Sequence, residues 1–112
     1  MKTWIIFVIV LSMVLSGSLA YCNPPKDIVV NITNDIVDVA VIHPSADPAD
    51  HYIKTIKISV NGVLFKEQSF TQQTGNEQDA SYQIPGLKKF DKVTVQAFCS
   101  KFGALTREKD VE

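Results

Sequence analysis

The sequence has no cluster of basic residues and no glycine-rich loop. Its 11 lysines and arginines are scattered among 12 acidic residues, and its formal net charge is −1. Nucleic-acid binding usually needs a basic stripe to hold phosphates, and nucleotide binding often uses closely spaced glycines, so the sequence favours neither. It also has no Gly-x-Ser-x-Gly segment, the signature of many serine hydrolases. The acidic side chains of the loops show no pairing pattern that would favour acid–base catalysis over simple solvation.

One long hydrophobic run is present, at the N-terminus. Met1 and Lys2 precede the twelve residues WIIFVIVLSMVL, and the small residues SGSLA follow them. This order is typical of a secretory signal peptide, and the run is shorter than the roughly 20 residues of a membrane-spanning helix. We therefore expect residues 1–20 to be a signal peptide that exports the protein to the periplasm or the exterior, with an uncleaved anchor as the alternative. The mature chain, residues 21–112, would carry a charge of about −2.

Cysteine is scarce. Only Cys22 and Cys99 occur, and both follow the predicted leader. Disulfides persist in exported proteins, and two cysteines allow one intramolecular pairing. A Cys22–Cys99 disulfide would exclude Cys99 as a metal-binding thiolate, so the two roles are alternatives.

The rest of the chain has the period-two alternation and the turn residues of a β protein. Turn signals occur at Asn34-Asp35, Asn61-Gly62 and Pro85-Gly86, and polar loops are expected at 43–50 and 71–78. We expect residues 21–35 to form an N-terminal extension with the first strand, and residues 36–112 to form the β-sandwich domain. The predicted strands are 28–33, 34–42, 51–60, 63–70, 80–84, 92–99 and 104–111. Seven short strands predict an all-β antiparallel sandwich or barrel.

The two histidines of the chain, His43 and His51, bracket the loop HPSADPADH. Cys99 ends the strand 92–99 and shares a face with Val93 and Val95, so its side chain is expected to point into the core. Three strand ends could bring these side chains together at one rim of the sandwich. Imidazole and thiolate ligands suit iron, zinc or copper better than magnesium or calcium. The alternative is that the histidines are ordinary exposed loop residues.

Three segments of the sequence resemble the superoxide reductase family, which includes desulfoferrodoxin and neelaredoxin. HPSADPADHYIKTIKISVNG is similar to the His-Pro…His-Tyr-Ile segment of that family, and TGNEQDASYQI is similar to the loop and strand that follow. DKVTVQAFCSKFG is similar to the last ligand segment, in which a strand ends in Cys-x-x-His-Gly. The resemblance covers about residues 36–110. It implies a seven-stranded immunoglobulin-like β-sandwich with a mononuclear iron held by four histidines and one cysteine.

Carried over by position, the resemblance implies that His43 and His51 are two of the histidine ligands and that Cys99 is the axial thiolate. The ligand set is incomplete, because Phe102 replaces the histidine three residues after the cysteine and residues 21–42 contain no histidine. The implied function is an exported iron-binding domain with oxidoreductase ancestry. A small electron-donor protein is the implied partner, and zinc or copper are alternative metals.

A second resemblance covers the C-terminal half of the chain. The His-Pro segment, DKVTV and the final ALTREKD are similar to segments of the SoxZ-type sulfur-oxidation subunit, which has a related sandwich. This resemblance implies the alternative function, a metal-free binding or carrier module.

Overall fold

The computed structural model describes residues 24–112. The predicted signal peptide, Cys22 and the start of the predicted N-terminal extension lie outside the described residues. Among residues 24–112 there is no helix with the length and hydrophobicity needed to cross a membrane.

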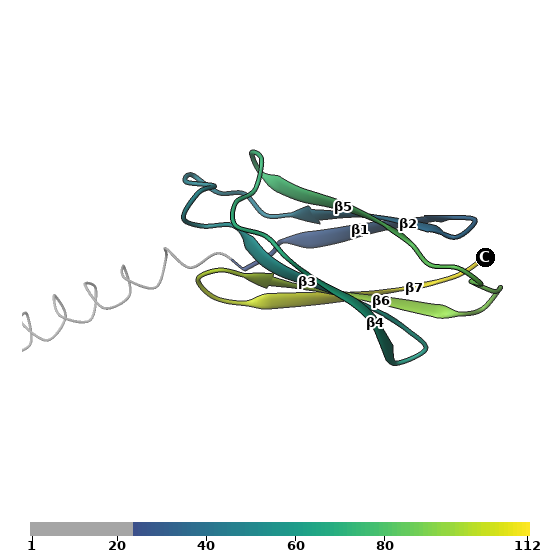
Figure 1. Ribbon diagram of the computed structural model, residues 1–112. Helices are drawn as coiled ribbons and strands as arrows, with labels where there is room; N and C mark the ends of the chain where they lie inside the picture. The colour runs from purple at the N-terminus through teal and green to yellow at the C-terminus, as the bar shows by residue number, and fades with distance from the viewer. Residues whose placement is uncertain (1–23) are drawn as a thin grey trace, which may run out of the picture.

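Within residues 24–112, seven antiparallel strands form two sheets that face each other (Figure 1). The three-stranded sheet has the order β1-β2-β5, and the four-stranded sheet has the order β4-β3-β6-β7. Compared with an immunoglobulin constant domain, the fourth strand pairs with the third strand instead of the fifth. The predicted all-β sandwich of seven strands is therefore confirmed. The strands are β1 (Asp27–Thr33), β2 (Ile36–Ile42), β3 (Ile53–Val60), β4 (Val63–Ser69), β5 (Glu77–Gln83), β6 (Lys92–Cys99) and β7 (Ala104–Asp110).

Alternating side chains of the strands build the core between the sheets. In β6 the pattern is strict, with Val93, Val95, Ala97 and Cys99 buried. Large aliphatic side chains from both sheets pack against them and exclude water, which is the main favourable term in folding. The fully buried ones are Val37, Val39, Val41, Ile53, Ile56 and Ile58. Cys99 therefore has the inward orientation that the sequence predicts.

Two tight turns, at Asn34–Asp35 and Asn61–Gly62, and the longer segment 84–91 join the strands at one end of the sandwich, which we call the turn end. Asn61 and Gly62 have φ angles of 50° and 82°, and Val60 pairs with Val63 directly across the turn. Two successive positive φ angles are characteristic of a type I′ hairpin turn, for which Asn-Gly is the preferred sequence. The hairpin predicted from Asn61-Gly62 is confirmed.

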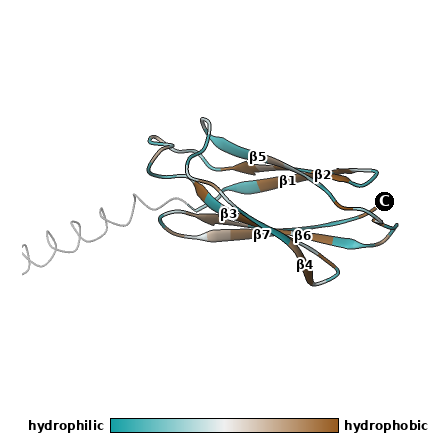
Figure 2. Cartoon of the chain, viewed as in Figure 1, coloured by the Kyte–Doolittle hydropathy of each residue, from teal (hydrophilic) through white to brown (hydrophobic). Residues whose placement is uncertain are grey.

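Three strands begin two or three residues away from the predicted positions, and the other strand ends agree within one residue; β2 begins at Ile36 instead of residue 34. β5 begins at Glu77 instead of residue 80, although its sequence is mainly hydrophilic (Figure 2). Glu77 and Gln78 pair with Ile42 and Val41 of β2, so backbone pairing between distant segments overrides the polar composition. β3 begins at Ile53 instead of residue 51, because His51 belongs to the preceding loop.

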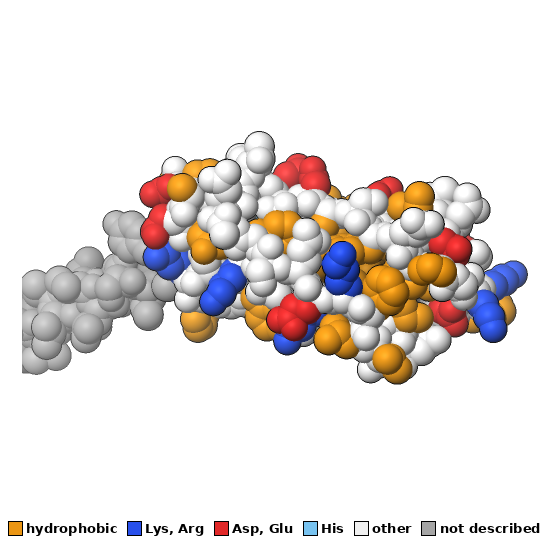
Figure 3. Space-filling view, viewed as in Figure 1, with side chains coloured by type: hydrophobic (Ala, Val, Ile, Leu, Met, Phe, Trp, Pro, Cys, Tyr) orange, Lys and Arg blue, Asp and Glu red, His pale blue; other side chains and the backbone are white. Residues whose placement is uncertain are grey.

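The two outer edges of the four-stranded sheet differ in character. β7 lies beside β1 of the other sheet, where the side chains of Arg107 and Asp27 approach to 3.1 Å. β4 has residues 63–67 exposed, and its Val63, Leu64 and Phe65 are 71%, 53% and 45% exposed. Figure 3 shows hydrophobic side chains gathered around the tip of this β3–β4 hairpin.

Candidate metal centre

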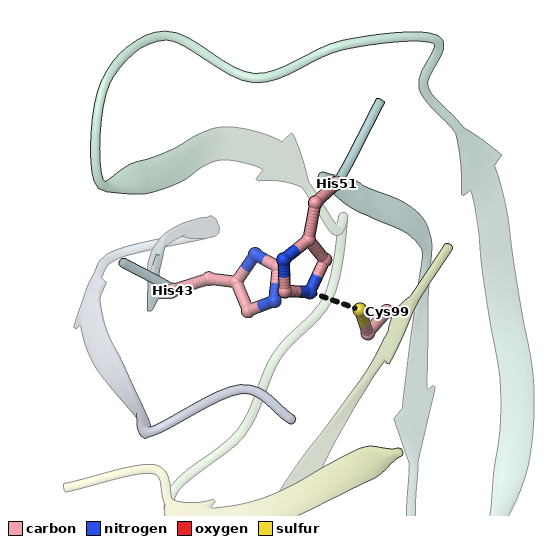
Figure 4. Close-up of side chains that lie close together, drawn as sticks. All are labelled: His43, His51 and Cys99. Atoms are coloured by element: carbon pink, nitrogen blue, oxygen red, sulfur yellow. Dashed lines mark hydrogen bonds between the residues drawn. The ribbon is translucent and has the colours of Figure 1, made fainter. Parts of the chain in front are cut away.

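The three predicted ligands come together at the end of the sandwich opposite the turn end. We call it the ligand end and define it by the loops 43–52, 70–76 and 100–103. His43 follows the last residue of β2, His51 comes two residues before β3, and Cys99 is the last residue of β6. β2 belongs to one sheet, and β3 and β6 belong to the other. The side chains therefore converge from both layers (Figure 4).

The geometry of this group suits one small ion. Its candidate ligand atoms all lie within 4.8 Å of one another, and His51 Nε2 is 2.9 Å from Cys99 Sγ. The rings of His43 and His51 meet edge to face, with centroids 4.6 Å apart. Since metal–nitrogen and metal–sulfur bonds are about 2.0–2.3 Å long, ligands of one ion lie roughly 3–4 Å apart. His43, His51 and Cys99 are therefore close enough to hold a metal ion.

Burial differs among the three ligand candidates. The side chain of His43 is inaccessible to solvent and Cys99 is 9% exposed, whereas His51 is half-buried. The group is therefore shielded on the side of the core and is reached from solvent on the side of His51. The prediction that these residues converge is confirmed, and the alternative of freely exposed loop histidines is wrong for His43.

The loop between the histidines is held by its own hydrogen bonds. The backbone N–H of His51 donates to the carbonyl oxygen of Asp47 at 2.7 Å, and Ser45 Oγ donates to the carbonyl oxygen of His51 at 2.6 Å. Pro44 and Pro48 limit the conformations of the same loop. The backbone on which His51 sits is thus fixed by contacts within the loop 43–52 and by hydrogen bonds from Ser100 to the carbonyl oxygens of Asp50 and Tyr52.

Cys99 is held by the turn that follows β6. Its backbone N–H donates to the carbonyl oxygen of Gly103 at 2.9 Å, and the N–H of Lys101 donates to its sulfur at 3.4 Å. Gly103 has a φ of 94°, and a Cβ at this position would overlap Pro24. Cys99 is a free cysteine, and its alternative disulfide partner, Cys22, lies outside the described residues.

No acidic side chain completes the group within residues 24–112. Asp50 of the same loop instead forms an exposed ion pair with Lys101, at 3.0 Å. Phe102 is 65% exposed and has no atom that binds a metal. A metal ion held by three protein ligands would keep a position for water or another small molecule.

One residue of this end is not identified by the sequence. Gln73 is 5% exposed, and its side-chain oxygen lies 2.8 Å from His43 Nδ1. Its neighbour Gln72 is exposed, and both belong to the polar segment TQQTGNEQ. Nothing in that segment distinguishes the buried glutamine from the exposed one, because the difference arises only when the loop packs against His43.

Searches against protein-family models, curated proteins and solved structures gave no match for this chain.

Proposed function

We propose that the protein is an exported metal-binding protein of the superoxide reductase type, with a single iron ion held by His43, His51 and Cys99. The observation that supports this proposal most directly is the convergence of the three side chains, whose ligand atoms lie within 4.8 Å of one another. Export is supported by the leader-like composition of residues 1–20.

The choice of metal depends on the ligand atoms and on the sequence resemblance. Two imidazoles and one thiolate suit iron, zinc and copper. The similarity of HPSADPADHYI and VTVQAFC to superoxide reductase segments favours iron among the three. The site lacks two of the histidines of that family, so we expect weaker iron binding and little superoxide reductase turnover. The proposed function is therefore iron binding with one-electron chemistry. A small electron-donor protein would supply the electron.

Metal analysis of protein purified anaerobically with a reductant and ferrous iron tests the proposal. We expect about one iron per chain and, after oxidation, a thiolate-to-iron absorption band. The Cys99→Ser and His51→Ala variants should lose both signals, whereas the control variant Cys22→Ser should keep them. Parallel reconstitution with zinc and copper identifies the preferred metal. Absence of bound iron would overturn the proposal, and a mass two hydrogens lower in protein purified without reductant would show the Cys22–Cys99 disulfide in its place.

The exposed apolar residues of β4 favour a second candidate function. Val63, Leu64 and Phe65 are exposed on the edge strand β4. Neighbouring exposed apolar side chains are typical of a surface that binds another protein. A metal-free binding or carrier module of the SoxZ type would use such a surface. If this is the function, Leu64→Asp should abolish partner binding while His51→Ala has no effect on it.

A further inference from the structure

Gln73 is a buried polar side chain at the centre of the ligand end. Its oxygen Oε1 lies 2.8 Å from His43 Nδ1 and accepts the backbone N–H of Ile53 at 3.0 Å. Its nitrogen Nε2 donates to the carbonyl oxygens of His43 and Gly75, at 2.6 and 3.0 Å. Every hydrogen-bonding group of this amide therefore has a partner, as expected for a polar group that is almost inaccessible to water.

These partners determine which way round the amide lies. The carbonyl oxygens of His43 and Gly75 can only accept hydrogen bonds, so the side-chain atom that faces them must be the NH₂ group. The backbone N–H of Ile53 can only donate, so the atom that faces it must be the oxygen. A flipped amide would place like groups against each other at all three contacts.

The orientation of the amide fixes the proton on His43. An amide oxygen has no hydrogen to donate, so the Nδ1 atom of His43, 2.8 Å away, must carry the proton. In a neutral imidazole the other nitrogen, Nε2, then has the lone pair. The ring of His43 points toward His51 and Cys99 (Figure 4). We propose that Gln73 is a positioning residue that fixes His43 in the Nδ1–H form, so that Nε2 is the atom offered to a metal ion.

The same side chain joins the segments that carry the ligands. It contacts the backbone just after β2 through the carbonyl of His43 and the first residue of β3 through the N–H of Ile53. The backbone N–H of Gln73 also donates to the carbonyl of Pro48, inside the loop between the two histidines, at 3.2 Å. Gln73 thereby sets the position of His43 relative to the loop that carries His51. The consequence for metal binding rests on the proposed function, whereas the protonated nitrogen of His43 is a property of the metal-free protein.

Long-range ¹H–¹⁵N NMR of the metal-free, reduced protein at neutral pH tests which nitrogen of His43 carries the proton. We expect the His43 ring to show a protonated Nδ1 and an unprotonated Nε2. In Gln73→Leu, which has no acceptor, the ring should change to a mixture of forms or to the Nε2–H form. In Gln73→Glu, which keeps an acceptor oxygen, the Nδ1 proton should remain. A wild-type spectrum with the proton on Nε2 overturns the inference without any variant, as does an unchanged spectrum in Gln73→Leu.

Competition with a chromogenic chelator for ferrous iron tests whether Gln73 positions His43 for metal binding. Residues that orient a metal-binding histidine typically change metal affinity about 10- to 100-fold, so Gln73→Leu should weaken iron binding by this factor. The control Gln72→Leu, an exposed neighbour in the same loop, should change it less than about twofold. Equal losses in both variants would overturn the positioning role. If the wild-type protein binds no metal, the proposed function fails, and the NMR result still decides which proton Gln73 fixes.

Discussion

The two ends of the sandwich are built by different kinds of contact. At the turn end, neighbouring residues make tight turns, and the side chain of Asn61 links its own turn to Asp91 and Lys92. At the ligand end, side chains separated by 30 to 48 residues contact each other, as His43 contacts Gln73 and His51 contacts Cys99. The tight turns themselves depend on local sequence, whereas the contacts of the ligand end, like the links from Asn61 to Asp91 and Lys92, form only when distant segments have come together.

The two ends also differ in whether their buried polar side chains have hydrogen-bond partners. At the ligand end, Gln73 has a partner for each of its hydrogen-bonding groups. Tyr82 lies in β5 near the turn end, is 3% exposed, and its hydroxyl has no hydrogen-bond partner among the described residues. An unsatisfied buried hydroxyl destabilises a fold, so it has a cost that the paired Gln73 avoids. The ligand end therefore buries a polar side chain at a lower energetic cost than the turn end does.

The largest effect is expected on metal affinity, in a variant of the ligand end. His51→Ala removes one of the three proposed ligands, so we expect the proposed affinity for iron to fall more than about 100-fold. Without metal, the free energy of unfolding of the variant should lie within about 1 kcal/mol of the wild-type value, since His51 is half-buried in a loop. Chelator competition and urea denaturation measure the two quantities. Equal iron affinity in variant and wild type would contradict the ligand role of His51.

Glycine substitutions at the two ends should differ in cost. Gly103 and Gly62 both have positive φ, at 94° and 82°, but a Cβ at Gly103 meets Pro24 whereas a Cβ at Gly62 meets nothing within 4 Å. Gly62→Ala should cost about 1 kcal/mol from backbone strain, and Gly103→Ala about 2–4 kcal/mol because overpacking adds to the strain. Urea denaturation checks both values. Similar costs at the two positions would show that Pro24 moves away from the new Cβ without a measurable loss of stability.

Asn61→Ala should weaken the turn end and leave the ligand end unchanged. The variant loses the bonds to Asp91 and Lys92 and places alanine at a φ of 50°, for a cost of about 1–2 kcal/mol. The hydrogen bond from Asn61 is the main cause that lowers the pKa of Asp91, followed by the backbone N–H of Lys88. A lowered carboxyl pKa adds stability above the unfolded value, 3.8, and this stability is lost as the pH falls through the folded value.

Urea denaturation between pH 2 and 7 therefore checks the Asn61 prediction. The stability of Asn61→Ala should fall less steeply in acid than that of the wild-type protein, while its iron affinity at neutral pH is unchanged. A loss of iron affinity would mean that the two ends are coupled through the strands.

Tyr82→Phe has the smallest expected effect at neutral pH. Removing an unpaired buried hydroxyl should leave stability unchanged or raise it by up to about 1 kcal/mol. Burial raises the pKa of Tyr82 to about 12, above its ordinary value of 10. The stability linked to this proton is present below pH 10 and is lost as the pH rises toward 12, so the wild-type protein should weaken in that range more than the variant. Alkaline denaturation checks this, and a destabilised variant at pH 7 would reveal a partner for the hydroxyl.

Much of the fold could be predicted from the sequence, because its determinants are local. The Asn61-Gly62 hairpin follows from residues that tolerate positive φ, and the inward orientation of Cys99 follows from the alternation in β6. The start of β5 could not be predicted, since Glu77 and Gln78 are strand residues only through pairing with β2. The convergence of His43, His51 and Cys99 was an expectation from strand ends, but Gln73 has no sequence signal. Membership of the superoxide reductase family and export stay predictions.

His43 is attached to the three-stranded sheet and Cys99 to the four-stranded sheet, so one ion bound to both would act as a removable cross-link between the layers. Such a cross-link closes a long chain segment, and it exists only in the folded state. By mass action, metal present at 100 times its dissociation constant would add about 2.7 kcal/mol to the free energy of unfolding. The resistance of the chain to unfolding and proteolysis would then report how much metal its compartment supplies.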